Sequence, residues 1–168
     1  SQSFIHSVSG GPDIVSCFML GVPTLPVYSG EIQGPGLGMN IDVYNEKGKP
    51  TKKTGELVCK TPFPSKPIYF WNDKLNRKYK SAYFEKFPNI WAHGDYVKKT
   101  NNGGYVIFGR SDATLNPGGV RIGTGEIYNS LQKFHWIEDC LATGYMTEND
   151  EKIVLFLKLS TSKITIDF

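Results

Sequence analysis

The stretch GRSDATLNPGGVRIGTGEIYN, residues 109–129, decides how the rest of this 168-residue chain is interpreted. It combines two arginines, an aspartate, an Asn-Pro-Gly-Gly run and the start of a helix. Asn116-Pro117-Gly118 predicts a type II turn, because proline presets φ at the second position and glycine accepts the positive φ needed at the third. Gly119 adds another residue without a Cβ, so the backbone here can approach a ligand closely. We therefore expect a functional loop in this stretch.

A helix is expected directly after this loop. Thr124 is a candidate N-cap, and Glu126 falls in the first turn, where the helix dipole favours an anion. Ile127, Leu131 and Phe134 recur at helical spacing, which predicts one apolar face that packs on a core.

Elsewhere the sequence predicts short strands with a single further helix. The residues before Met39 are rich in Gly, Pro and Ser and indicate loops and short strands. Strands are predicted at residues 39–44, 56–59, 91–98, 105–108, 137–143 and 153–159. The apolar run at 153–157 predicts a strand that is buried on both faces. Residues 73–87 predict a helix whose core face carries Tyr79, Tyr83 and Phe87.

Composition excludes several classes of protein. Hydrophobic residues make up 39% and charged residues 21% of the chain, which is ordinary for a soluble globular domain. A net charge of +3 gives no reason to expect a nucleic-acid partner. The basic residues Lys74, Arg77, Lys78 and Lys80 are expected to form a solvated face. The sequence has no long apolar run and no signal peptide, so we expect no membrane partner and a cytoplasmic location.

Cysteine usage points the same way. Cys17, Cys59 and Cys140 are odd in number and widely spaced in apolar surroundings, which predicts buried free thiols in a reducing compartment. None of the three histidines, His6, His93 and His135, lies at a zinc-like sequence spacing from these cysteines.

Several segments, in order along the chain, resemble the adenylate-forming enzymes, the acyl-CoA synthetases and their relatives. The 109–129 stretch is similar to the signature at the domain junction of that family. The other similar segments are Ser9-Gly-Gly-Pro-Asp13, residues 30–44, Gly55-Glu-Leu-Val58, Trp71-Asn-Asp73 and Trp91-Ala-His-Gly-Asp-Tyr96. The resemblance covers roughly residues 7–159. It is more specific than any one of these motifs.

The resemblance implies an α+β fold. Residues 1–111 are expected to form the β-rich C-terminal part of the large AMP-binding domain, and residues 112–168 a truncated small C-terminal domain. The family's phosphate-binding loop is expected upstream of Ser1, and its adenylation lysine downstream of the last matched strand. We therefore expect a partial chain.

The resemblance also assigns roles in binding ATP. Asp95 matches the aspartate that accepts hydrogen bonds from the ribose hydroxyls, a task that suits two carboxylate oxygens. Arg110 matches an arginine at the ribose and Arg121 one at the phosphates, where a planar cation is favourable. Asp13 matches the acid that helps to hold Mg²⁺, a hard cation. The residue before it departs from the family, because Pro12 stands where a threonine is usual.

Further roles concern the acyl group and coenzyme A. Asp112 corresponds to the hinge about which the small domain turns between the two half-reactions. Gly118 and Gly119 match a turn beside the tunnel for coenzyme A. Gly10 and Gly11 match the acyl pocket, where a glycine in place of a tryptophan leaves room for an acid longer than acetate, such as acetoacetate.

The expected activity is therefore that of an acid–thiol ligase, in which ATP activates acetoacetate and coenzyme A takes up the acyl group. The alternative is a catalytically inactive truncated product that at most binds nucleotide or a partner. A purely structural β-rich interaction domain explains less, because it gives no reason for so many segments in the order of one family.

Overall fold

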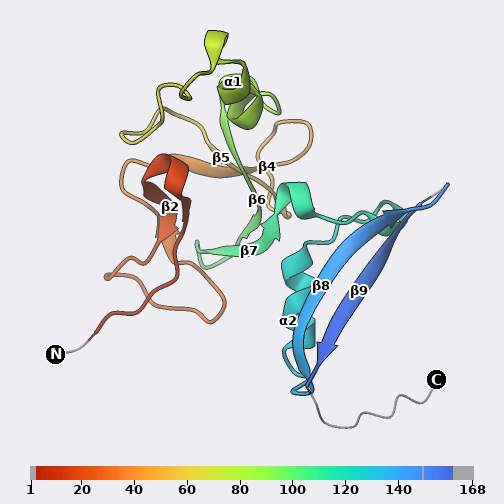
Figure 1. Ribbon diagram of the computed structural model, residues 1–168. Coiled ribbons are helices and arrows are strands. Elements are labelled where there is room, and N and C mark those ends of the chain that lie inside the picture. The colour runs from red at the N-terminus through yellow and green to blue at the C-terminus, as the bar shows by residue number, and fades with distance from the viewer. Residues whose placement is uncertain (1–2, 149, 161–168) are drawn as a thin grey trace. The chain divides into compact units, whose positions relative to one another are not determined.

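The computed structural model describes residues 3–148 and 150–160, and the chain forms two compact units, Ser1–Ile107 and Phe108–Phe168. The division lies a few residues before the predicted boundary at 111/112. That boundary stays a prediction. The described residues combine short strands in three sheets with two short α-helices, and this confirms the α+β class (Figure 1).

The first unit is mainly antiparallel sheet. Its elements are β1 (Ser9–Gly11), η1 (Pro12–Ile14), β2 (Ser16–Leu20), β3 (Gly34–Pro35), β4 (Ile41–Tyr44), β5 (Gly55–Cys59), η2 (Lys74–Asn76), α1 (Arg77–Phe84) and β6 (Trp91–Lys99). Strands β1, β2 and β3 form one sheet, and β4, β5, β6 and β7 (Tyr105–Arg110) form another. The predicted hairpin of β4 and β5 is confirmed, with Ile41 opposite Cys59 and Tyr44 opposite Glu56.

Helix α1 is shorter than the predicted span of 73–87. It is preceded by Leu75 and Asn76, both with positive φ, and followed by Pro88. The Asp73 carboxylate accepts hydrogen bonds from the backbone N–H groups of Lys78 at 3.1 Å and Tyr79 at 2.9 Å, which satisfies two donors of the first helical turn.

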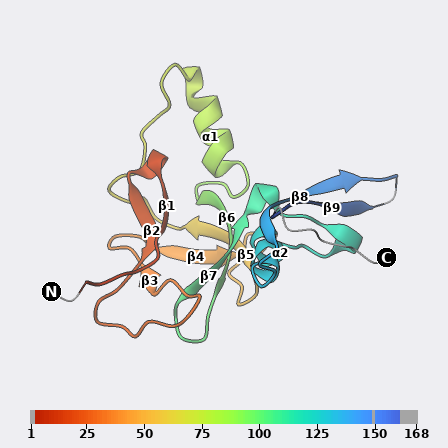
Figure 2. The same cartoon turned by 60° about the horizontal axis from the view of Figure 1, so that its bottom comes forward.

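The core of the first unit is aromatic, and α1 packs on β6 (Figure 2). Tyr79 is buried, and Tyr83 stacks on buried Trp91 with ring centroids 3.7 Å apart, which confirms the predicted core face. Phe87 is also buried, but it lies beyond the end of α1 and packs in a second cluster with Tyr44.

The second unit consists of one hairpin, one helix and the loop before them. Its elements are η3 (Ser111–Ala113), η4 (Pro117–Gly119), α2 (Thr124–Leu131), β8 (Ile137–Met146) and β9 (Glu151–Leu159). Strands β8 and β9 pair antiparallel along almost their whole length, and α2 contacts β8. Both strands were predicted, and their existence is confirmed.

Three local predictions in this unit are wrong in detail. β9 is not buried on both faces, since Phe156 is 58% exposed; β9 pairs with β8 alone in a two-stranded sheet of the described residues. Thr124 is not the N-cap of α2. Gly123 takes that place, and its N–H donates to the Glu126 carboxylate at 3.3 Å. Phe134 lies beyond the last helical residue, Leu131.

Glycine is required at Gly123 for packing. A Cβ there would lie 2.3 Å from the Phe108 carbonyl oxygen, so only glycine lets the chain start α2 this close to the preceding strand. The Gly-rich character of the 109–129 stretch therefore has a structural cause as well as the expected functional one.

Candidate active-site segments

Asp95 projects from a wide bulge in β6. Glu56 pairs with Tyr96 and Val58 with Ala92, so the three residues 93–95 stand opposite Leu57 alone. Gly94, in the middle of the bulge, has φ of +86°, a conformation that glycine adopts without strain. A bulge of this kind re-aims the side chains beside it.

The Asp95 carboxylate is held from two sides. The Ser9 hydroxyl donates to Asp95 Oδ2 at 3.1 Å, and His93 Nε2 lies 3.9 Å from the same oxygen. The Asp95 side chain is 13% exposed, so it keeps an accessible edge. The His93 ring is buried and meets the Phe18 ring edge-on, with centroids 4.6 Å apart. The carboxylate is thus fixed in direction but still reachable from solvent.

Asp13 meets this group at Gly11. A Cβ on Gly11 would lie 2.2 Å from Asp13 Oδ1 and 3.2 Å from His93 Cε1, so the missing side chain leaves the room in which both residues meet. The Tyr83 hydroxyl donates to the other Asp13 oxygen. The structure therefore brings Gly11 and Asp13 close to His93, whose ring lies beside Asp95, so predicted site residues from two distant segments lie near one another. We name Ser9, Gly11, Asp13, His93 and Asp95 the carboxylate cluster.

The turn that carries Asp13 is strained just beyond the acid. Val15 has φ of +48°, and its N–H bonds to the Pro12 carbonyl. Positive φ is unusual for a β-branched residue, and strain of this sort is concentrated at functional sites. Pro12 occupies the first position of η1, where its missing N–H leaves no helical bond unmade.

Gly10 has a structural reason of its own. A Cβ there would lie 2.2 Å from the Ser16 carbonyl oxygen and 2.7 Å from Cys17 Cα, so β1 and β2 approach too closely for any side chain. A bulky residue at this position would have to displace β2. Its proposed place in the acyl pocket therefore cannot be tested by substituting Gly10 itself.

In the second unit, the Asn-Pro-Gly-Gly loop is closed at its base and tied at its tip. Leu115 and Ile122 exchange two backbone hydrogen bonds, of 2.9 and 2.8 Å. Gly118 has φ of +58°, as glycine was predicted to allow. The turn bond runs from the Val120 N–H to the Pro117 carbonyl, so the turn lies one residue later than predicted.

The tip of this loop is fixed by the residues that open β9. The Gly118 N–H donates to Asp150 Oδ1 at 2.8 Å, and the Asn116 N–H donates to the Glu151 carboxylate. These charge-assisted bonds hold the backbone of the loop in one conformation. The loop can therefore present Arg121, which is exposed and follows the turn, from a rigid base.

Arg110 and Asp112 form a local pair at the start of the second unit. Arg110 Nε lies 3.3 Å from Asp112 Oδ1, and the two side chains are 52% and 73% exposed. An ion pair this exposed contributes little to stability and is easily exchanged for another partner. Asp112 lies within η3, a single short turn between β7 and the loop.

Sequence reasoning missed the residues that hold the site residues in place. Ser9 and Tyr83 position the two aspartates, and Asp150 and Glu151 position the loop. Each is far in sequence from its partner, and no local pattern reports such a pairing. The motif Ser9-Gly-Gly-Pro-Asp13 was the one available signal, since it places Ser9 four residues before Asp13.

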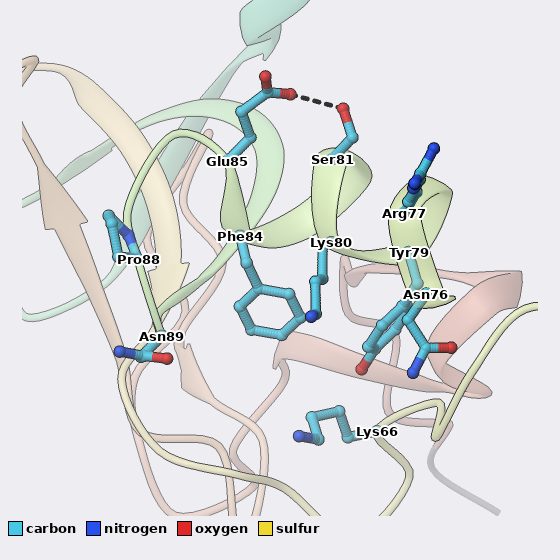
Figure 3. A pocket seen from close by; sticks show the side chains of 10 residues that line it. All are labelled: Lys66, Asn76, Arg77, Tyr79, Lys80, Ser81, Phe84, Glu85, Pro88 and Asn89. Atoms are coloured by element: carbon cyan, nitrogen blue, oxygen red, sulfur yellow. Dashed lines mark hydrogen bonds between the residues drawn. The ribbon is translucent and has the colours of Figure 1, made fainter. Parts of the chain in front are cut away.

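A separate cavity of about 700 Å³ lies beside α1 and contains none of the predicted site residues (Figure 3). Its lining includes three cations, Lys66, Arg77 and Lys80, and one acid, Glu85, which accepts a hydrogen bond from Ser81. The Lys66 ammonium lies 5.9 Å from the Phe84 ring centroid. The predicted solvated face overlaps this cavity, and its four basic residues are exposed.

The remaining titratable groups give no further centre. Cys17, Cys59 and Cys140 are free, and burial raises the pKa of the Cys59 thiol. Within residues 3–148 and 150–160, no three His, Cys, Asp or Glu side chains are grouped so that they could hold a metal ion. No helix in that part of the chain is long and apolar enough to cross a membrane.

The chain is similar in sequence and in fold to known proteins. The chain is 56% identical to an acetoacetyl-coenzyme A synthetase of Rhizobium meliloti over 157 residues, which is 93% of this chain and 24% of that protein. It superposes on the acetoacetyl-CoA synthetase of Streptomyces lividans with a TM-score of 0.88 and 42% identity, covering 98% of this chain and 25% of that one. No family model matches the chain.

A more distant structure shows how widely the fold is shared. The O-succinylbenzoate coenzyme A synthetase of Bacillus subtilis, solved with ATP and magnesium ion, superposes with a TM-score of 0.74 at 16% identity, covering 95% of this chain and 32% of that one. This likeness shows the fold alone.

The fold matches a segment of the adenylate-forming enzymes. Within that class the chain belongs to the acetoacetyl-CoA synthetase family. It spans about a quarter of the length of the curated relatives it matches.

Proposed function

We propose that this chain is the part of an acetoacetate–CoA ligase that grips the nucleotide and carries the hinge of the small domain. The whole protein would use ATP to activate acetoacetate and would then transfer the acyl group to coenzyme A. The observation that carries this proposal is the carboxylate cluster, in which Ser9 and Asp95 bond across most of the first unit while Asp13 lies at Gly11.

The cluster fits the expected ligands chemically. Asp95, held by Ser9 and keeping an exposed edge, is suited to accept two hydrogen bonds from a ribose diol. Asp13 is an exposed carboxylate, and Mg²⁺ in nucleotide sites is commonly held by one or two carboxylates together with phosphate oxygens. Bound there, the ion would offset phosphate charge. Gly11 lacks the Cβ that would clash with the Asp13 carboxylate.

The second unit would supply cations and the moving part. Arg121 would meet the phosphates, and Arg110 the ribose. Asp112, in a short turn with an exposed side chain, is suited to a hinge, because few contacts would have to break when the chain turns there. Gly118 and Gly119 would border the path of coenzyme A, where a side chain would obstruct the substrate. The bond from the Gly118 N–H to Asp150 holds this loop in place.

The test is pyrophosphate release in a ligase that carries this chain within the length of its relatives. Asp95→Ala should lower kcat/KM for ATP by about 10²-fold, the effect of losing hydrogen bonds to a charged group. Asp42→Ala is the matched control, because Asp42 forms an ion pair with Lys60 and lies outside the carboxylate cluster. Equal losses in both variants would refute the ribose role. A preference for acetate over acetoacetate would refute the substrate.

The alternative is a product that binds nucleotide without turnover. Residues 1–168 alone, supplied with ATP, Mg²⁺, coenzyme A and acetoacetate, are expected to release no pyrophosphate above background, because the parts of a catalytic unit do not contribute in proportion to their number. Turnover by these residues would show that they complete a site.

A further inference from the structure

We infer that Glu56 is a positioning residue that holds Asp95 in place through the bulge of β6, with Lys86 as its partner. Glu56 lies in β5 and is only 3% exposed, which is rare for a carboxylate without a partner. Its two oxygens have different tasks. Oε1 accepts the Gly94 N–H at 2.8 Å, and Oε2 meets the Lys86 ammonium at 2.5 Å.

The Gly94 bond is the important one for position. Residues 93–95 face a single residue of β5, so their backbone cannot complete an ordinary strand ladder. A bulge leaves an N–H unpaired, and a buried unpaired N–H is unfavourable. The Glu56 carboxylate satisfies that donor at the centre of the bulge. Gly94 separates His93 from Asp95, so fixing Gly94 fixes the direction of both side chains.

Lys86 orients the Glu56 carboxylate through the ion pair. It follows α1, and its side chain is 39% exposed, so the ion pair joins a buried acid to a partly exposed base. The Lys86 ammonium also lies 5.8 Å from the Phe87 ring centroid. The end of α1 is thereby linked to the bulge, and the same helix supplies Tyr83 to Asp13. Helix α1 and the residues directly after it thus support both acids of the carboxylate cluster.

This inference rests on the proposed function for its consequence, since Asp95 matters to activity only where it binds nucleotide. A purely structural role would also be served by a buried ion pair. The difference lies in what is lost when Glu56 is changed. A structural residue affects stability. Changing a positioning residue alters the bulge and weakens nucleotide binding by more than the loss of stability explains.

The experiment compares Glu56→Ala, Glu56→Gln and Val58→Ala, each made in a ligase that carries this chain within the length of its relatives. Glutamine keeps an oxygen that can accept the Gly94 N–H. Val58 is the matched control because it lies in the same strand, is fully buried and has an apolar side chain that cannot accept the Gly94 N–H. Each variant is measured for amide hydrogen exchange at residues 93–95, for Tm and for the Kd of ATP.

Glu56→Ala is expected to speed exchange at Gly94 and to raise the Kd of ATP, each by about tenfold, the loss of one charge-assisted hydrogen bond. Glu56→Gln should stay within about threefold of the wild type. Val58→Ala should lower Tm without either change. Unchanged exchange at Gly94 in Glu56→Ala, or an equal rise of Kd in Val58→Ala, would overturn the positioning role. If the wild type does not bind ATP, the proposed function fails, and the exchange measurement still decides whether Glu56 holds the bulge.

Discussion

The Ser9 hydroxyl donates a hydrogen bond of 3.1 Å to the Asp95 carboxylate, although the two residues are 86 positions apart. The bond joins β1 of one sheet to the bulge of β6 in another. It also helps to fix the direction of the Asp95 carboxylate, whose side chain is 13% exposed. An acid that must accept bonds from a diol benefits from such a fixed orientation.

Ser9→Ala should therefore weaken nucleotide binding without abolishing it. One hydrogen bond to a charged group is lost, and the affinity for ATP should fall by about tenfold, which is less than the loss for Asp95→Ala. Isothermal titration with ATP measures both. Ser130→Ala, which removes an exposed hydroxyl bonded within α2, is the control. The role of Ser9 is refuted if both serine variants bind ATP as the wild type does.

Lys86→Met tests the buried ion pair energetically. The substitution leaves the Glu56 carboxylate buried without its cation, and breaking a buried pair in this way costs about 3 kcal/mol of unfolding free energy. Lys60→Met is the comparison, since its partner Asp42 is 26% exposed where Glu56 is 3% exposed, and loss of that pair should cost about 1 kcal/mol or less. Urea unfolding of both variants gives the two values. Similar values would mean that Glu56 does not depend on Lys86.

Asp73 makes the stability of α1 depend on pH. Burial acts to raise the pKa of this carboxyl, but the backbone N–H groups of Tyr79, Lys78 and Arg77 together outweigh it, so the pKa lies below the usual 3.8. Because the folded-state pKa is depressed, the stabilisation is present above the unfolded-state value and is lost as the pH falls through the folded-state value.

The neutral variant Asp73→Asn should consequently unfold at a lower temperature than the wild type at about pH 6, and the difference should vanish by about pH 2. Thermal unfolding followed by circular dichroism over this range measures it. Asp139→Asn, which changes an exposed acid in β8, should show no comparable difference. A gap in Tm that persists at the acid end would contradict the explanation.

The sequence was sufficient where structure is local and insufficient where distant segments meet. The spacing of Tyr79 and Tyr83 predicted their shared core face because a helix repeats every few residues. The apolar run in β9 predicted a strand correctly but not its exposure, because a sequence run does not tell what covers a strand.

The candidate site divides in the same manner. Asp13 and Asp95 were named from their motifs, whereas Tyr83, Ser9 and Glu56 were not, because each acts on a residue that only the fold brings near. The roles of the named residues stay predictions. The structure adds the hydrogen bonds that hold these residues in place, and substitutions that remove those bonds test the roles.

Arg121→Ala is the direct test of charge at the phosphates. Losing one preorganised donor at a transition state should lower the rate of adenylate formation by about 10²-fold in the proposed ligase. Arg77→Ala removes the same charge from the exposed start of α1 and should leave that rate within about twofold. Pyrophosphate release is the measurement. Equal rates in the two variants would remove Arg121 from the site.

Gly118→Ala separates backbone strain from function. Gly118 has φ of +58° and Gly103, in the turn between β6 and β7, has φ of +86°; a Cβ at either position would meet no atom within 4 Å. Alanine should therefore cost about 1 to 2 kcal/mol at each position, from the left-handed backbone alone. If Gly118 borders the path of coenzyme A, Gly118→Ala should also slow thioester formation while pyrophosphate release continues, and Gly103→Ala should affect neither step. Single-turnover assays of the two half-reactions, together with urea unfolding, make the comparison. Loss of both half-reactions in Gly118→Ala would place the loop at the nucleotide and not at the thiol. If Gly118→Ala and Gly103→Ala lose the same stability and neither changes thioester formation, Gly118 is a turn residue only.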